Sequence, residues 1–256
     1  MSELYYLHVS PWSEKACWAM DLSNYDYTKI NFTPMVTAPI VRLRSRNFTR
    51  KITAPTLISN QGHISDAYKI AQHVNNENNG EHHASVDLFP TELNSQINEW
   101  ETLSNQILQA GRALVCIRLK NNRGAKLMSL PSAIPPVIRP IMLPLATVGL
   151  YYFKAKYGFD WNGHEKYIET MRQGLRKAQK QLSNNGDYLL GKFTYADIAL
   201  AVTLQMVEPA GNKYIPLDTD TENCWKTPEL KKEFTDLIEW RNRIYQKHRP
   251  ALTHRP

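Results

Sequence analysis

The pattern of apolar residues changes near residue 75, and this change restricts the possible folds more than any other feature of the chain. Before it, short strand-like segments rich in aromatic and β-branched residues alternate with helical segments. In chain order they are strands at Glu3–Val9, Tyr27–Phe32, Thr56–Ser59 and His63–Ile64, and helices over Ser13–Ser23 and from about Asp66. After it, apolar residues recur only at helical spacing, over Glu92–Leu119, Lys166–Leu182 and Leu230–Tyr245. The predicted fold class is a small α/β domain followed by an all-α domain.

A polar stretch from Asn75 to Ser85, rich in Asn, Glu and Gly and without hydrophobic periodicity, predicts the boundary between these domains. We expect the first domain over residues 1–78, a linker over 79–90 and the helical domain over 91–256. A chain of 256 residues is long enough for two modest domains. The basic stretch from Val41 to Lys51 is expected to be irregular.

The cysteines and the charge exclude several function classes. Cys17, Cys116 and Cys224 stand far apart, so neither a disulfide framework nor a metal site is predicted. The first residues lack the pattern of a cleaved signal, and together with the isolated thiols this favours a cytoplasmic protein. The net charge of +7 comes from Lys and Arg spread through both halves, so a nucleic-acid partner is not expected.

One apolar segment, LMSLPSAIPPVIRPIMLPLATVGLYYF over residues 127–153, raises the question of a membrane. Its five prolines would interrupt a spanning helix repeatedly, and Arg139 lies in its middle. We therefore expect no membrane insertion, and a proline-kinked connection packed within the helical domain.

Three local features of the first domain concern chemistry. Ser10 to Ser13 (SPWS) lie where a strand gives way to a helix, so free backbone N–H groups there would stabilise an anion, or a serine would simply cap the helix. Pro55 precedes a strand and is either an ordinary strand-initiating proline or a cis proline. Asp66 begins a helix, where a carboxylate favours the helix dipole.

Together with the second half of the chain, these motifs resemble the glutathione transferase family. The SPWS turn, TAPTL and ISDAYKIAQHV are similar to its thioredoxin-like amino-terminal domain. DYLLGKFTYADIALAVTL is similar to the signature of its all-helical domain, in which Thr194 caps a helix and Asp197 answers it three residues later. The closing segment WKTPELKKEFTDLIEWRNRIYQKHRP resembles the last helices of bacterial members.

The resemblance implies a role for individual residues. Ser10 matches the hydroxyl that addresses the sulfur of glutathione, and Tyr6 is the alternative, because some classes use a tyrosine at the end of the strand. The remaining glutathione-binding positions are Trp12, Ser13, Ala54, Pro55, Ser65 and Asp66. Ala67 departs from the family, which usually has a serine there to bind the γ-glutamyl carboxylate.

The implied function is the activation of the glutathione thiolate for attack on a hydrophobic electrophile, with glutathione as co-substrate and no metal. The electrophile would lie against the helical domain, with the aromatic and apolar residues of Trp100 to Leu114 and the proline-rich segment as candidates. A homodimer is usual in the family. The alternative is a binding or regulatory scaffold of the same fold without catalysis; a thiol reductase is disfavoured because Ser10 is not a cysteine.

Overall fold

The computed structural model describes residues 2–46, 52–81, 86–131 and 134–249. Part of the expected linker, residues 82–85, lies outside them, as does the end of the basic stretch at Lys51.

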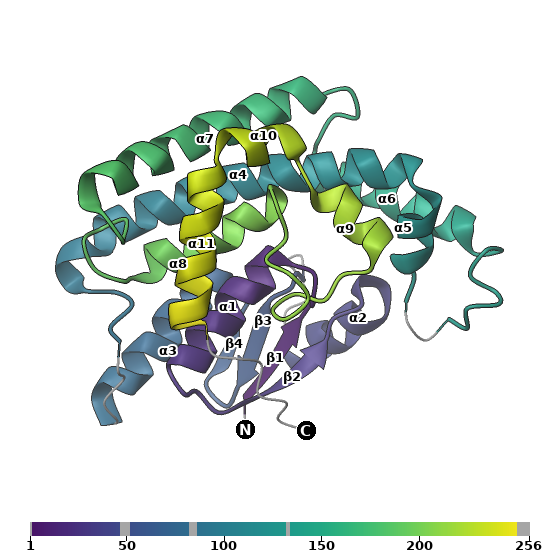
Figure 1. Ribbon diagram of the computed structural model, residues 1–256. Coiled ribbons are helices and arrows are strands. Elements are labelled where there is room, and N and C mark those ends of the chain that lie inside the picture. The colour runs from purple at the N-terminus through teal and green to yellow at the C-terminus, as the bar shows by residue number, and fades with distance from the viewer. Residues whose placement is uncertain (1, 47–51, 82–85, 132–133, 250–256) are drawn as a thin grey trace.

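The first half of the chain forms a four-stranded sheet with helices on both faces (Figure 1). Its strands lie in the order β2-β1-β3-β4; β1 pairs with β2 in parallel and with β3 antiparallel, and β3 pairs with β4 antiparallel. The elements are β1 (Ser2–Tyr6), α1 (Pro11–Leu22), β2 (Tyr27–Asn31), α2 (Pro34–Arg44), β3 (Thr56–Ser59), β4 (Gly62–Ile64) and α3 (Ala67–Glu81). This is the small α/β domain that the strand and helix pattern predicted, with the thioredoxin-like fold that the resemblance implied.

Two predictions for this half need correction. The stretch from Val41 to Lys51 was expected to be irregular, yet helix α2 continues to Arg44. Val41 is fully buried there, against a cluster formed with Tyr5, Phe32 and Ile52 under the sheet. Ala38 packs against the same cluster, so tertiary packing stabilises a helix whose weak local signal, with Pro39 inside it, predicted a loop.

Helix α3 continues to Glu81, through the polar stretch that was expected to lack structure from Asn75 onward. The Asn75 side chain is buried; its amide donates to Asp87 and its carbonyl accepts from the backbone N–H of Leu88. An asparagine that marks a loop in the sequence thus links the end of the first half to the start of the second.

The second half is entirely helical among its described residues. Its α-helices are α4 (Asn94–Asn121), α5 (Arg123–Met128), α6 (Leu143–Tyr157), α7 (His164–Asn185), α8 (Tyr195–Thr203), α9 (Thr219–Trp225), α10 (Pro228–Glu233) and α11 (Thr235–His248). Short 3-10 turns stand at Thr91–Leu93 and Leu204–Met206. Every residue of α8 is buried, and α4 packs along both α7 and α8. At the crossing of α4 and α7, a Cβ on Gly174 would stand 2.6 Å from Ile107, so the close approach needs glycine.

Helix α1 joins the halves, lying between the sheet and the helices α8 and α11 (Figure 1). The Trp18 indole of α1 donates to the backbone carbonyl of His248, 230 residues away. The buried Arg249 guanidinium binds the carboxylates of Glu14 and Asp21, also on α1. A helix that begins at the SPWS turn is thus held from both sides.

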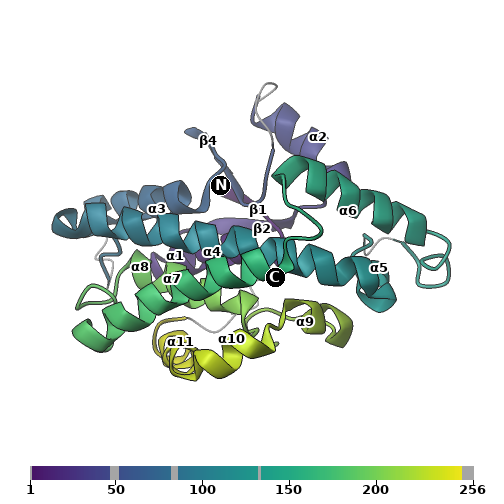
Figure 2. The same ribbon diagram turned by 90° about the horizontal axis from the view of Figure 1, so that it is seen from above.

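The proline-rich segment differs from its prediction. It was expected to pack within the helical domain, but several of its apolar side chains are exposed, including Val137 at 85% and Ile141 at 75%. The prolines direct the chain through successive turns between α5 and α6, outside the bundle of α7 to α11 (Figure 2). None of the helices in the described ranges combines the length and apolar character needed to cross a membrane.

Candidate functional site

The turn between β1 and α1 is held by its own hydrogen bonds. The Ser10 N–H donates to the Leu7 carbonyl (2.8 Å), and the Leu7 N–H donates to the Ser13 hydroxyl (3.0 Å). Ser10 is the N-cap of α1, with Pro11 in the first turn, and its hydroxyl accepts a long hydrogen bond from the Ser13 N–H (3.5 Å). The strand therefore turns directly into a helix whose amino end is open at Ser10.

The two serines of this turn have different environments. Ser13 is 1% exposed and its hydroxyl is used as the acceptor for Leu7, whereas Ser10 is only partly buried. A serine hydroxyl has one donor and two acceptor positions, so Ser10 keeps its O–H donor while its oxygen accepts from Ser13. Of the pair, Ser10 is the one able to donate to a ligand at the end of α1.

The strand-end tyrosines alternate as expected. Tyr5 is buried beneath the sheet, where its hydroxyl contacts Glu3 and accepts a hydrogen bond from Arg44. Tyr6 lies on the other face, partly exposed, and burial together with the neighbouring Cys17 raises its pKa. Tyr6 therefore stays a neutral O–H donor at physiological pH.

Two further segments of the first half carry the residues singled out in the sequence. The peptide bond between Ala54 and Pro55 is cis. Thr56, which follows, donates its hydroxyl to the Thr53 carbonyl (2.7 Å) and lies 2.8 Å from the Ser65 hydroxyl. The start of β3 and the turn before α3 are thereby tied together.

Asp66 precedes α3 and remains exposed. Its carboxylate accepts a hydrogen bond from the Lys69 N–H (2.9 Å), which leaves acceptor positions open at the positive end of the helix dipole. The next residue, Ala67, is 3% exposed and packs in the core. A carboxylate therefore faces solvent here, while the family's usual hydroxyl is absent.

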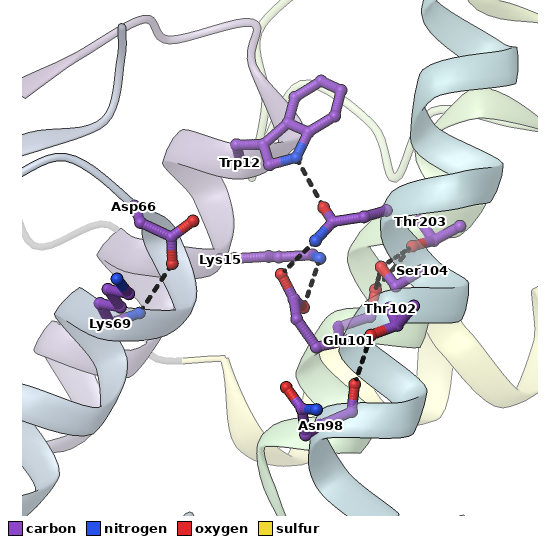
Figure 3. Close-up of polar contacts among 11 residues, drawn as sticks. Trp12, Lys15, Asp66, Lys69, Asn98, Glu101, Thr102, Ser104 and Thr203 are labelled. Carbon is purple, nitrogen blue, oxygen red and sulfur yellow. Dashed lines mark hydrogen bonds and ion pairs between the residues drawn. The ribbon is translucent and has the colours of Figure 1, made fainter. Parts of the chain in front are cut away.

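A polar network links the SPWS turn to α4, and the sequence interpretation missed it. The Trp12 indole donates to Asn105 (2.8 Å), the Asn105 amide donates to Glu101 (3.0 Å), and Glu101 binds the Lys15 ammonium (2.7 Å). Figure 3 shows Trp12, Lys15 and Glu101 converging between α1 and α4. Lys15 is fully buried; burial lowers its pKa, and the carboxylate of Glu101 opposes that shift.

A cation on α4 completes this side of the site. The Arg112 guanidinium lies 3.6 Å from the centre of the Tyr157 ring and 5.0 Å from that of Trp12. Burial lowers the pKa of Arg112, and no carboxylate of the described residues lies within 4 Å of it. The local signal was present, because polar residues at 101, 105 and 112 follow helical spacing along one face of an apolar helix.

The thiols near the site are unreactive. Cys17 is buried in α1, and burial raises its pKa to about 12, as expected for a packed small hydrophobe. Burial also raises the pKa of Cys116 on α4 to about 12. Within the described ranges, no group of three or more His, Cys, Asp or Glu side chains is arranged to hold a metal ion.

The predicted capping motif of the helical half is confirmed. Thr194 is the N-cap of α8, and its backbone N–H donates to the Asp197 carboxylate (2.8 Å), which also accepts from the Leu189 N–H (2.9 Å). Burial raises the pKa of Asp197 to about 7, although these hydrogen bonds oppose the shift. The motif is a folding device inside the core, away from the SPWS turn.

Sequence-family models match both halves. Residues 4–82 match the glutathione S-transferase N-terminal domain, and residues 150–247 match the glutathione S-transferase C-terminal domain, together more than half of the chain. The chain belongs to the glutathione S-transferase family. Among curated proteins, none matches the sequence.

Solved structures of glutathione S-transferases share the fold. One from Methylobacillus flagellatus with glutathione bound is 17% identical, with a TM-score of 0.57 over 96% of this chain and 95% of that one. One from Methylobacterium radiotolerans, in complex with glutathione sulfonate, is 15% identical, with a TM-score of 0.56 over 96% and 91%. Glutathione transferase Omega 3C from Trametes versicolor is 12% identical, with a TM-score of 0.53 over 94% and 88%. At such identities the likeness establishes the architecture of this chain and not its substrate.

Proposed function

We propose that this chain is a glutathione transferase that activates the thiolate of glutathione for attack on a hydrophobic electrophile. The observation that carries the proposal is the Ser10 hydroxyl at the amino end of α1, whose O–H has no acceptor among the described residues. Family membership supports glutathione as the ligand, and the glutathione-bound relative of the same fold agrees with it.

In the proposed reaction, the glutathione thiol gives its proton to solvent, and the sulfur anion accepts the Ser10 O–H hydrogen bond. The positive end of the α1 dipole lowers the pKa of the thiol further. The sulfur lone pair then forms a C–S bond with the electrophilic carbon, and the leaving group departs with the electrons of its own bond to that carbon. In an addition no group leaves. The π electrons of the attacked double bond move to the neighbouring atom, which then takes a proton from water.

We assign the rest of glutathione to the exposed edge of the first half. The Ala54 backbone, before Pro55, would pair with the cysteinyl unit, and the Asp66 carboxylate would bind the γ-glutamyl amine. Ser65 and the N–H groups at the start of α3 would receive the γ-glutamyl carboxylate that Ala67 does not bind.

At the other end of the tripeptide, Trp12 would border the sulfur and the glycyl unit. Ser13 would contribute through its backbone, because its hydroxyl is buried and used by Leu7. The electrophile would lie against α4, and Arg112 favours electrophiles that also carry an anionic group.

The resemblance carries three further proposals: a bacterial-type subclass with a catalytic serine, a homodimer and a cytoplasmic location. Each is testable separately from the chemistry, for example by sedimentation equilibrium for the dimer.

The deciding experiment measures glutathione binding by calorimetry, and turnover with a panel of aryl halides, epoxides and enones, with and without a carboxylate. Ser10→Ala is expected to lower kcat/KM by about 100-fold, the usual cost of losing one donor to a developing anion. It is also expected to raise the pKa of bound glutathione, read from thiolate absorbance against pH. Ser13→Ala is the matched control, expected to affect stability rather than that pKa. If Ser10→Ala keeps full turnover, the serine role is wrong and Tyr6→Phe becomes the variant to test.

A non-catalytic binding or regulatory scaffold is the second candidate, and Ala67 is the observation that favours it. If the native protein binds no glutathione at millimolar concentration, the enzyme is refuted and the scaffold remains. Ala67→Ser adds the family's hydroxyl at this position; restored binding would identify Ala67 as the cause.

A further inference from the structure

Residues 137–152 present an unusually apolar surface to solvent. Four side chains in two short stretches illustrate its extent: Val137 is 85% exposed, Ile141 75%, Val148 62% and Tyr152 54%. Ile138, Leu145 and Tyr151 are also exposed, at 42%, 37% and 50%. Contiguous exposed apolar surface of this kind marks an interaction site far more often than chance.

Helix α6 is apolar on all sides but uses only one of them for packing. Ala146 and Leu150 are its buried residues, facing the neighbouring helices α4 and α5. Figure 2 shows α6 on one side of α4 and α5, and α9 and α10 on the other. The exposed side chains thus lie on an outer face that the described parts of the chain leave uncovered.

The backbone of the preceding turns is suited to a medium poor in hydrogen-bond acceptors. Pro135, Pro136, Pro140 and Pro144 have no N–H to satisfy. Each remaining N–H from Ile138 to Leu143 donates to a carbonyl three or four residues earlier. These five N–H groups need no water when the turns approach a lipid surface. The Val137 N–H has no acceptor among the described residues and would hydrogen-bond to water or a lipid headgroup.

The stretch of sequence that contains this surface carries charge of a single sign. Between Glu101 and Asp160 the sequence contains no acidic residue and eight cations, which are Arg112, Arg118, Lys120, Arg123, Lys126, Arg139, Lys154 and Lys156. Among the described residues, no carboxylate lies within 4 Å of Arg139 or Lys154, which stand in and beside the apolar stretch. Arg112 lies over Tyr157 and Arg118 binds the Cys224 carbonyl, so these two cations do not belong to the surface. Apolar side chains and tyrosines beside cations such as Arg139 and Lys154 are typical of segments that enter the interface of an anionic bilayer.

We propose that residues 137–156 form a docking surface for an anionic lipid bilayer. Val137 and Ile141 insert into the headgroup region from the proline-rich turns, and α6 lies along the surface with Val148 and Tyr152 facing the lipid. Arg139 and Lys154 contact the lipid phosphates. The contact is peripheral, and it brings the protein to the phase in which hydrophobic small molecules concentrate.

A second copy of the chain fits this surface less well than lipid does. A two-fold dimer that packs this face against itself at the axis would bring Arg139 and Lys154 close to their own equivalents, with no carboxylate in the stretch to pair with them. An anionic bilayer supplies the opposite charge and the apolar medium together.

The test is co-sedimentation of the full chain with vesicles of phosphatidylcholine alone, or of phosphatidylcholine with 40% phosphatidylserine, at about 0.1 M and 1 M salt. We expect binding to the anionic vesicles only, weakened at high salt. Val137→Ser/Ile141→Ser is expected to weaken it about tenfold or more. Arg139→Gln/Lys154→Gln is expected to weaken it by about fivefold for each cation.

The matched control removes the same charge from another face. Lys177→Gln/Lys180→Gln, exposed on α7, is expected to leave vesicle binding unchanged. Circular dichroism checks that each variant is folded. Equal loss in this control would mean that the net charge alone drives binding, which overturns the proposal.

Two other results would also overturn it. One is absence of binding by the native chain to anionic vesicles at millimolar lipid. The other is a dimer in lipid-free solution that Val137→Ser/Ile141→Ser converts to monomer, because the surface would then belong to a second copy.

Discussion

Replacing Glu101 by Gln tests whether the buried ion pair between the two halves has the energetic importance its geometry implies. The Lys15 side chain is 0% exposed and that of Glu101 7%, with 2.7 Å between the ammonium nitrogen and the carboxylate oxygen. Glu101→Gln preserves the shape of the side chain and an oxygen for the Asn105 amide, but removes the negative charge. The ammonium of Lys15 then loses its paired carboxylate, and Asp66 remains as an opposite charge that makes no ion pair with it.

The loss in the free energy of unfolding has an upper limit. The folded variant can release the Lys15 proton, at about 1.4 kcal/mol for each unit between the solution pH and the unfolded pKa of about 10.4. This limit is about 5 kcal/mol at pH 7 and about 2 kcal/mol at pH 9. Breaking a buried pair usually costs about 3–5 kcal/mol, so we expect a loss in that range at pH 7 and no more than about 2 kcal/mol at pH 9.

The sign follows from proton binding. The pKa of Lys15 is lower in the folded chain than in the unfolded chain, so the unfolded chain binds more protons between these two pKa values. The free energy of unfolding therefore rises with pH. Urea unfolding at pH 7 and pH 9, followed by tryptophan fluorescence and circular dichroism, measures both quantities. Lys15→Met/Glu101→Gln removes both charges and is expected to regain most of the loss at pH 7.

An exposed pair of nearly the same length is the matched control. Lys192 and Glu92 approach to 2.8 Å, with side chains 53% and 65% exposed. Glu92→Gln is therefore expected to cause no measurable change in the free energy of unfolding. Two results would refute the reasoning that a buried charge is left unpaired. One is a loss of unfolding free energy in Glu101→Gln that is no larger than the loss in Glu92→Gln. The other is a loss in Glu101→Gln that is equal at pH 7 and pH 9.

Two further predictions concern buried carboxylates. Asp197→Ala leaves two buried N–H groups without an acceptor and is expected to lower the free energy of unfolding by about 2–4 kcal/mol, and Asp197→Asn by less. Burial raises the pKa of Asp197 to about 7, so the folded chain binds a proton that the unfolded chain has lost above about pH 4. As the pH rises from about 4 to 7, the wild-type free energy of unfolding should therefore fall more steeply than that of Asp197→Asn. Parallel profiles from urea unfolding would contradict this. Arg249→Met leaves Glu14 buried and unpaired, with an expected loss of about 3–5 kcal/mol by urea unfolding, whereas Arg176→Met, on an exposed pair, should be nearly neutral. Equal losses in the two arginine variants would show that Glu14 is not left as a buried charge.

Much of the fold was predictable because its signals are local. The β3 strand at Thr56–Ser59 has the predicted bounds, and the Thr194–Asp197 cap depends on residues three apart. Helix α2 was missed because its packing contacts, at Val41 and Ala38, outweigh its weak local preference.

The candidate site was predictable only in part. The SPWS turn was visible in the sequence, and the resemblance singled out Ser10. That Ser13 is buried and engaged by Leu7 needed the packed turn. The partner of Lys15 lies 86 residues away, a separation at which no periodic pattern connects two positions.

The sequence by itself determined the change from an α/β half to an all-α half, the strand-turn-helix at Ser10 and the cap of α8, because each depends on backbone preferences and hydrogen bonds within a few residues. Only the tertiary structure decided which apolar residues are covered. Leu150 and Val148 are equally suited to burial by composition, yet one is 7% and the other 62% exposed, because α6 has neighbours on a single side. The hydrophobicity of a side chain sets how much free energy its burial gains. The arrangement of distant segments decides whether another part of the chain covers it.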